Sequence, residues 1–489
     1  MRYLGEGGVV NRIVVVGLGV LSGCGGGGAD LEVSDGAVPG VAEVHFTSKK
    51  EGIARVYYSV SGGPEQQTPP SASGTEHDVT LLGLKAGMTY TVRVEVEGAN
   101  GKITSSDEIE FTAGPPSQGM PIFSLEESEP ELMCDPGGYF LFGFIGDAAS
   151  GVGILDRDSQ YVWTVPNEEP GAQVGRPRPG RDGKSILWNY ADSERIEDLA
   201  AVVRLSMDGK TRTVTRTLNG HHDFVELPDG KIAWLGYAFD EAHEFELDGM
   251  MVTAPVAVDT IHEVEEGTSD AAAASTVFNM FEDYPHPVYN TGNNFRESGF
   301  LPGYREFSHG NSIAYLEHDD SYLIMLRWIS ALVKVDRATG AFVWQMGGVQ
   351  NEFDDTDNPG SDENLFFEPH FSDAWSDQLF VFNNGPKPTP NNPSTSRLMR
   401  YTLDEDGRTF TNTWSYDTGD YENILGDVRR MGIEGCDNVL VSFSGQGRIA
   451  ELTPDGRVAW STAGSLGYVT TRVYYLPDLY DFTGAGYPQ

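Results

Sequence analysis

The sequence is poor in basic residues. Among its 489 residues, 33 are lysine or arginine and 73 are aspartate or glutamate, so the formal net charge is −40 at pH 7. An excess of carboxylates of this size repels a phosphate backbone, which excludes nucleic acid as a partner. The charge is typical of an acidic secreted protein.

Long hydrophobic runs are also missing. The apolar run near the N-terminus, Ile13–Leu21, is too short to span a bilayer as a mature helix, but it suits the core of a signal peptide. It leads into Leu21-Ser22-Gly23-Cys24, which resembles a bacterial lipobox, whose cysteine becomes the lipidated first residue. We therefore expect a lipoprotein signal peptide over residues 1–23 and a flexible tether over 24–38. An ordinary signal peptide with an incidental Cys24 is the alternative.

This N-terminus predicts a location in the bacterial cell envelope, on the periplasmic side or at the outer membrane. A lipid on Cys24 would be the only contact with the membrane.

Glycine and proline are abundant instead, with 59 and 27 residues, and 11% of the chain is aromatic. Together with many short apolar runs, this predicts an all-β protein with many turns. The chain is too long for one ordinary core, so we expect at least two domains.

Residues 39–114 predict a small β-sandwich of the immunoglobulin or fibronectin kind. Polar and apolar residues alternate there in five segments: Val41–Thr47, Ala54–Ser59, His77–Leu81, Thr89–Glu97 and Asp107–Thr112. The stretch Leu82–Tyr90 resembles the tyrosine corner of fibronectin type III domains, in which a tyrosine hydroxyl bonds back to the backbone. Ala113–Ser117, which contains Pro115 and Pro116, is the expected linker.

A repeated unit of strands and turns follows from residue 120 to residue 489. Six units begin near Gly138, Gly183, Gly230, Asp320, Asp377 and Asp437. Repeated meanders of this length are typical of propeller blades, so we predict a six-bladed β-propeller. Val469–Asp481 is expected to supply an outer strand that closes the ring. The insertion Val252–Pro302 is expected to be a loop over one face, either a lid or surface padding.

The two remaining cysteines, Cys134 and Cys436, each precede a predicted strand near one end of the propeller sequence. The first and last blades of a closed ring are neighbours, and an oxidising compartment favours pairing. A Cys134–Cys436 disulfide is therefore a further prediction.

Three histidines recur at the same phase of the repeat. His222, His309 and His370 each precede the apolar part of a blade. Because equivalent positions of a propeller converge around its axis, we expect them to meet at one mouth of the channel.

Arg327 and Asn311 are predicted to join these histidines, with Arg327 inside the first strand of the fourth blade. Three histidines alone suit zinc. Arginine beside a metal cation is unfavourable, however, whereas arginine, asparagine and histidine together complement a sulfate or phosphate. The sequence thus favours an anion site without a metal.

Several blocks resemble the bacterial arylsulfotransferase family in the correct order, over about Gly138 to Tyr480. They are HHDFVELPDGKIAWL, HGNSIAYLEHDDSYLIMLRWISALVKVDRATGAFVWQMGG, PHFSDAWSDQLFVFNNG, SRLMRYTLDEDG and EGCDNVLVSFSGQGRIAELTPDGRVAW. The resemblance implies a periplasmic propeller enzyme that moves a sulfuryl group from a phenolic sulfate ester to another phenol. It implies no cofactor, and the chain has no glycine-rich phosphate loop.

The resemblance also implies roles for individual residues. His370 would be the nucleophile of a ping-pong reaction and carry a transient sulfohistidine. His222, His309, Asn311 and Arg327 would hold the sulfuryl oxygens, and one of the histidines would move the phenolic proton.

Arg397, in a recurrent Ser-Arg pair of the family, would be either a further sulfuryl contact or part of a salt bridge within its blade.

One departure from the family pattern concerns the nucleophile. Glu368 and Pro369 precede His370, where the family often has glutamine, and the carboxylate is expected to raise the pKa of His370. Two other functions stay open: an envelope lipoprotein whose propeller binds a ligand or partner without catalysis, and a metal- or quinone-dependent enzyme on the same scaffold.

Overall fold

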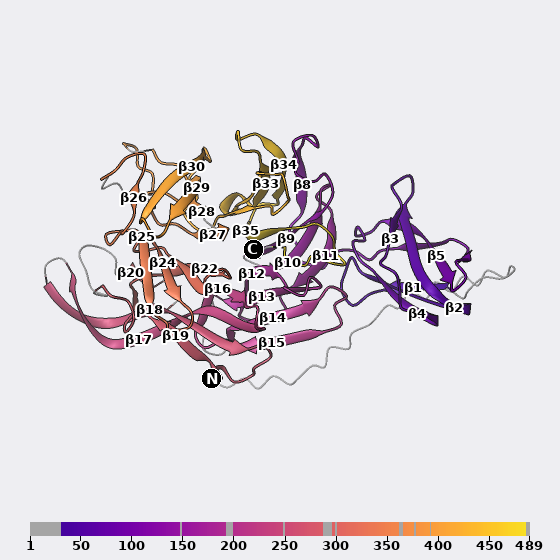
Figure 1. Ribbon diagram of the computed structural model, residues 1–489, viewed down its shortest axis with the longest axis horizontal. Helices are drawn as coiled ribbons and strands as arrows, with labels where there is room; N and C mark the ends of the chain where they lie inside the picture. Colours follow the sequence, from indigo (N-terminus) through magenta and orange to yellow (C-terminus); the bar gives the residue numbers. More distant parts are fainter. Residues whose placement is uncertain are drawn as a thin grey trace, which may run out of the picture.

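The computed structural model describes residues 31–146, 149–191, 199–247, 250–286, 296–298, 301–360, 365–375, 378–391 and 393–485. The predicted signal peptide and Cys24 lie outside these residues. The described chain forms a small β-sandwich followed by a ring of six β-sheets, as predicted (Figure 1). No described helix is long and apolar enough to cross a membrane.

One long strand connects the two layers of the N-terminal sandwich. The first half of β2 (Ala42–Val60) pairs with β1 (Leu31–Asp35) and β4 (Gly74–Leu81), and its second half pairs with β5 (Thr89–Gly98). Three short strands complete the layers: β3 (Gln66–Gln67), β6 (Ile103–Ser105) and β7 (Ile109–Thr112). Strand β1 lies within the segment predicted as a tether, so the sandwich begins earlier in the chain than expected.

The tyrosine-corner hydrogen bond is present. The hydroxyl of Tyr90 accepts a hydrogen bond from the Lys85 amide at 2.7 Å. The same end of the sandwich docks on the propeller, where the Leu82 amide donates to the Tyr480 hydroxyl and Lys85 pairs with Asp156 at 2.8 Å.

Each propeller blade is a four-stranded antiparallel meander, some with extra short strands. The blades are, from the inner strand outward, β35-β9-β10-β11, β12-β13-β14-β15, β16-β17-β18-β19, β22-β23-β24-β25, β27-β28-β29-β30 and β31-β32-β33-β34-β8. Their strands run as follows: β8 Phe123–Ser128, β9 Tyr139–Gly146, β10 Ser150–Asp156, β11 Tyr161–Pro166, β12 Gln173–Pro179, β13 Ser185–Ala191, β14 Ala201–Ser206, β15 Arg212–Arg216, β16 Gly220–Glu226, β17 Lys231–Leu247, β18 Met250–Glu265, β19 Ser275–Asn279, β22 Gly310–Leu316, β23 Ser321–Leu326, β24 Ala331–Asp336, β25 Phe342–Gly347, β27 Phe371–Trp375, β28 Gln378–Asn383, β29 Arg397–Asp404, β30 Thr409–Asp417, β31 Asp427–Arg430, β32 Val439–Phe443, β33 Arg448–Leu452, β34 Val458–Gly464 and β35 Tyr468–Leu476. The remaining short elements are β20 Arg296–Glu297, β21 Arg305–Glu306, β26 Asp354–Asp355 and the 3-10 helices Ala271–Ala273 and Ser444–Gln446.

Ring closure differs from the prediction. The C-terminal strand β35 is the innermost strand of the first blade, where it pairs with β9, and not an outer strand. Its residues Thr470–Leu476 are buried, which suits a strand next to the channel. The outer strand at the seam comes from the other end, because β8 pairs with β34 of the sixth blade.

The predicted insertion is largely regular structure. Strand β18 is the third strand of the third blade and extends with β17 into a long hairpin beyond the ring (Figure 1). Residues 256–264 of β18 are buried, and Val256, Val258 and Ile261 among them belong to the apolar core of the blade. The prediction of a loop is therefore wrong for β18 and β19.

A disulfide lies at the seam of the ring. Cys134 and Cys436 are bonded across a Cα–Cα distance of 5.6 Å. Beside it, Arg157 pairs with the buried Glu451 at 2.7 Å, and Glu451 also accepts from the Cys134 amide. These contacts join the segment after β8 to the sixth blade.

Candidate active site

The inner strands of neighbouring blades bring the three predicted histidines to one end of the channel. His222 lies in β16, and His309 and His370 immediately precede β22 and β27. All three are buried. His222 and His309 have positive φ angles of 46° and 54°; His222 lies within a β-bulge, and a β-bulge follows His309. A bulge re-aims side chains, so the repeated backbone irregularity explains why these histidines converge.

His222 and His309 are in direct ring contact. Their ring centroids lie 4.6 Å apart in an edge-to-face arrangement, and Nδ1 of His221 lies 2.9 Å from Nδ1 of His222. Burial, reinforced by His309 and His221, holds the pKa of His222 well below its usual range. His222 is therefore neutral at physiological pH.

His309 has a carboxylate partner that the sequence did not reveal. Its Nδ1 lies 2.5 Å from Oε2 of the buried Glu306, whose other oxygen accepts from the Tyr237 hydroxyl at 3.0 Å. Burial alone would raise the pKa of Glu306, but His309 and its other hydrogen-bond donors outweigh burial and lower this pKa to about 2. The ionised carboxylate can only accept, so the hydrogen of His309 lies on Nδ1.

His370 has the opposite arrangement. The Leu425 amide donates to its Nδ1 at 3.1 Å, and Nδ2 of Asn311 donates both to the same nitrogen and to the Pro369 carbonyl, each at 3.2 Å. Two donors on Nδ1 place the hydrogen of the neutral ring on Nε2. Nε2 of His370 is buried and has no hydrogen-bond partner among the described residues, and the same holds for Oδ1 of Asn311.

Positive charges surround His370. Burial is the largest cause of its pKa lying well below the usual range, followed by the charges of Arg327 and Arg176. The prediction that Glu368 raises this pKa is wrong. The Glu368 carboxylate is held by Arg327 at 3.2 Å and by Arg296 at 2.8 Å.

Arg327 reaches the site from a different element than expected. It follows the end of β23, in the turn that leads to β24, and does not lie inside the first strand of its blade. Its guanidinium donates to the Asn423 carbonyl at 2.8 Å and stacks on Trp328 with 4.4 Å between Cζ and the ring centroid. This turn was not predicted from the sequence, because Trp328 and Ile329 continue the apolar pattern of the strand.

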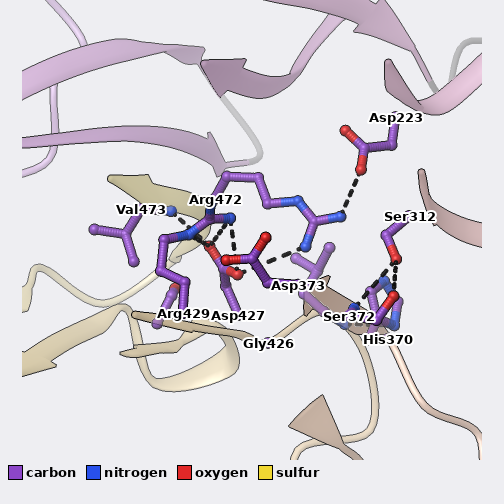
Figure 2. A network of polar contacts seen from close by, with 12 residues as sticks. Asp223, Ser312, His370, Ser372, Asp373, Gly426, Asp427, Arg429, Arg472 and Val473 are labelled. Carbon is purple, nitrogen blue, oxygen red and sulfur yellow. Dashed lines mark hydrogen bonds and ion pairs between the residues drawn. The ribbon is translucent and has the colours of Figure 1, made fainter. Parts of the chain in front are cut away.

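A buried network of ion pairs fills the channel below the histidines, and Figure 2 shows its centre. Asp223 of β16 pairs with Arg178 of β12 at 3.2 Å and with Arg472 of β35 at 2.9 Å. Asp427 of β31 pairs with Arg429 at 3.0 Å and lies 3.7 Å from Arg472. Each charge in the chain of contacts has an opposite partner, as buried charges require.

The same network fixes the backbone that carries the site. Asp223, the residue after His222, accepts a hydrogen bond from the Ile313 amide at 3.1 Å. Arg472 donates to the Asn311 carbonyl at 3.3 Å. These contacts tie β16 and β35 to the strand that carries Asn311.

Three further residues of the site, Glu306, Arg176 and Arg472, are not predicted by the sequence patterns. Arg176 and Arg472 lie on the inner strands β12 and β35. Neither strand was predicted to line the channel, so their arginines were not expected at the site. Glu306 lies just before β22, the first strand of the fourth blade, and it has no counterpart in other blades.

Arg397 is not brought to this site. It begins β29 as an exposed residue, and no hydrogen bond or ion pair joins it to the site residues in the described chain. Its neighbour Ser396 is buried and donates to the Asn384 carbonyl at 2.8 Å. Within the described residues, no group of three or more His, Cys, Asp and Glu side chains has the geometry of a metal site.

The fold and the site define a six-bladed propeller with buried histidines and arginines at the mouth of its channel. The chain belongs to the arylsulfotransferase (ASST) family, whose model matches residues 139–464. This match confirms the resemblance seen in the sequence blocks. No curated protein matches the chain.

Several solved structures are distantly similar. A Lactobacillus plantarum protein is 13% identical, with coverage of 87% of this chain and 100% of that one and a TM-score of 0.35. Apo AztD from Citrobacter koseri is 10% identical, with coverage of 87% and 98% and a TM-score of 0.27. Hsv2p from Kluyveromyces lactis is 8% identical, with coverage of 91% and 98% and a TM-score of 0.30. These values carry no functional argument.

Proposed function

We propose that the protein transfers a sulfuryl group from an aryl sulfate ester to a phenol through a sulfohistidine on His370. Family membership already assigns sulfotransferase activity on small aromatic molecules. The observation that supports His370 as the nucleophile is its buried, neutral ring with an unpartnered Nε2 close to Arg327. Nε2 carries the hydrogen of the neutral ring, so this nitrogen becomes a nucleophile as a neighbouring base removes that hydrogen.

In the first half-reaction, a neighbouring base removes the hydrogen from Nε2 of His370 as this nitrogen attacks the sulfur of the donor, and the bond from sulfur to the phenolic oxygen breaks. The hydrogen on Nε2 leaves as the nitrogen–sulfur bond forms, and it ends on the departing phenolate. The product is an N-sulfoimidazole with an uncharged ring and an anionic sulfo group, so Nδ1 keeps its hydrogen bonds from Asn311 and Leu425 throughout.

His309 is suited to carry that proton. Its Nδ1–H is held by Glu306, so Nε2 is the ring nitrogen that takes the proton and passes it to the phenolate. The carboxylate stabilises the imidazolium that forms in between, as in other carboxylate–histidine pairs. In the second half-reaction the acceptor phenol attacks the same sulfur, and the proton returns by the reverse path.

The arginines stabilise the anionic sulfuryl oxygens. Arg327 is the cation that contributes most to the depressed pKa of His370, and Arg176 is the second. The Arg327 guanidinium is paired with Glu368, so a bound sulfate group competes with this carboxylate for it.

The direct test is release of nitrophenol from p-nitrophenyl sulfate by the purified protein, with and without a phenol acceptor. We expect release that depends on the acceptor, survives a chelator and disappears in His370→Asn. Loss of activity with chelator would contradict the proposal and favour a metal enzyme. Silence with several aryl sulfates would favour the alternative of a ligand-binding propeller.

A further inference from the structure

The end of the β-sandwich that faces away from the propeller is a cationic tip. The bend of β2 and the turn between β5 and β6 meet there, because Gly52 of β2 pairs with Gly98 of β5. They enclose a cavity of about 470 Å³, whose lining includes the apolar Val94 and Val96 and the lysines Lys49, Lys50 and Lys102. The opposite end, with the tyrosine corner, docks on the propeller.

These lysines are unusual in this acidic chain. The whole sequence has nine lysines, and three of them line this one cavity, together with a single carboxylate, Glu51. Lys49, Lys50 and Lys102 are exposed, and none forms an ion pair with a described residue.

Four of the other six lysines have carboxylate partners within 4 Å: Lys85, Lys210, Lys231 and Lys334. The positive charge of the tip is therefore available to a partner. Strand β5, which runs from the docked end to the tip, has 10 residues. It therefore spans about 30 Å, more than the Debye length of about 10 Å at 0.1 M salt, so the charge of the propeller is screened at the tip.

Apolar residues flank the lysines. Ile53 and Ile103 both pair with Glu97 of β5, which places the two isoleucines on one face, on either side of the exposed Glu97. Their exposed fractions are 42% and 55%, high for aliphatic side chains. Lysines beside exposed isoleucines match the interface of a bilayer, where cations meet anionic head groups and apolar side chains enter the acyl boundary.

The chain also enters the sandwich at this end. Leu31, the first residue of β1, pairs with Phe46, three residues before Lys49. Cys24 precedes Leu31 by seven residues, a length of chain that spans at most about 24 Å. If Cys24 carries a lipid, as the lipobox predicts, the cationic tip lies within reach of the membrane surface.

We propose that this tip binds the surface of a bilayer containing anionic lipids, and thereby adds a protein contact to the predicted lipid anchor. The proposal is independent of the sulfotransferase reaction, since the tip lies at the end of the sandwich opposite its contact with the propeller. Binding at the tip holds the sandwich end-on to the membrane and the propeller away from it.

The test uses the full chain with Cys24→Ser, which removes the residue that would carry a lipid, and phosphatidylcholine vesicles with and without phosphatidylglycerol. We expect co-sedimentation only with phosphatidylglycerol, and weakening by salt. Lys49→Glu/Lys50→Glu should lower the partition coefficient at least about 20-fold. The matched control Lys184→Glu/Lys387→Glu changes two exposed lysines of the propeller and should change it less than about twofold.

Equal losses in the two pairs of variants, or no binding to phosphatidylglycerol vesicles, would overturn the proposal. Binding of soluble glycerol phosphate without vesicle binding would overturn it as well, in favour of a site for a small anion. Nitrophenol release in solution should be the same for both pairs, so failure of this proposal and failure of the sulfotransferase proposal are separable.

Discussion

Two histidines with their hydrogens on opposite ring nitrogens lie at the mouth of the channel. His309 has its hydrogen on Nδ1 because Glu306 accepts it, and His370 has its hydrogen on Nε2 because Asn311 and Leu425 donate to Nδ1. One ring can therefore take up the proton that the other releases. This pairing gives the two residues distinct roles in one reaction.

Glu306→Gln tests the role of this carboxylate as a positioning group. Without its charge the His309 imidazolium loses its stabilisation, and proton transfer to a poor leaving phenol should slow about 100-fold or more. Donors with acidic phenols need little protonation and should be affected much less. The measurement is kcat/KM over a series of aryl sulfates of increasing phenol pKa.

The buried Glu263, which pairs with Arg337 at 2.8 Å, offers a control outside the site. Glu263→Gln should leave the dependence on the leaving group unchanged. The same steepening in both variants would mean that the effect of Glu306 is structural.

Substitution of each arginine tests whether Arg327 or Arg397, both predicted from the sequence, belongs to the site. Arg327→Ala removes a cation next to His370 and should lower kcat/KM about 100-fold or more, the usual loss for one stabilising donor. Arg397→Ala removes an exposed side chain and should change kcat/KM less than about twofold. A large loss in Arg397→Ala alone would contradict this assignment of the site.

At the scale of elements, the seam between the first and sixth blades is the place where the ring can open. The strands β35 and β8 come from opposite ends of the propeller sequence, and the Cys134–Cys436 disulfide lies beside them. Because the disulfide links positions separated by 302 residues, it strongly restricts the unfolded chain.

Cys134→Ser/Cys436→Ser should therefore destabilise the protein by about 2–5 kcal/mol, measured by denaturant unfolding with and without reductant. The activity at room temperature should be retained, because the disulfide lies outside the site. An unchanged unfolding midpoint for the variant would show that β35 and β8 close the ring unaided.

The repeated strand pattern of the sequence predicted the number of blades but not the strand at which each blade begins. The predicted starts, such as Gly230 and Asp320, fall in the turns before the second strands β17 and β23. The first strands carry polar channel residues, such as Asp223 and Ser312, and therefore lack the apolar signature of a strand.

The histidines were found because they recur in the repeat, whereas other site residues have no such signal. Glu306 occurs in one blade only, and Arg327 was assigned to a strand because the apolar pattern runs through its turn. Non-local ion pairs such as Asp223–Arg472 depend on ring closure, which a local pattern does not encode.

On the scale of the whole molecule, neutral buried histidines make folding sensitive to acid. Burial holds the pKa of His222 and of His370 well below the usual range and lowers the pKa of His262 to about 4. In the unfolded chain these pKa values return to about 6.5. Below pH 6.5 the unfolded state then binds protons that the folded state does not.

The free energy of unfolding should therefore fall as the pH drops from 6.5 to 5, by up to about 1.4 kcal/mol per pH unit for each of these histidines. Denaturant unfolding at several pH values measures this slope. His262→Asn lies outside the site and should reduce the slope by roughly one histidine's share. A stability that is constant or rises between pH 6.5 and 5 would contradict the buried neutral state.

The central claim is the covalent intermediate on His370. The most direct measurement is intact-protein and peptide mass spectrometry after brief mixing with p-nitrophenyl sulfate in the absence of an acceptor, with the released nitrophenol recorded in parallel. The predicted result is a burst of one equivalent of nitrophenol, one added sulfuryl group on the peptide that contains His370, and loss of that group when a phenol is added. A burst without any sulfuryl group on the chain, or the same label in His370→Asn, would contradict the account.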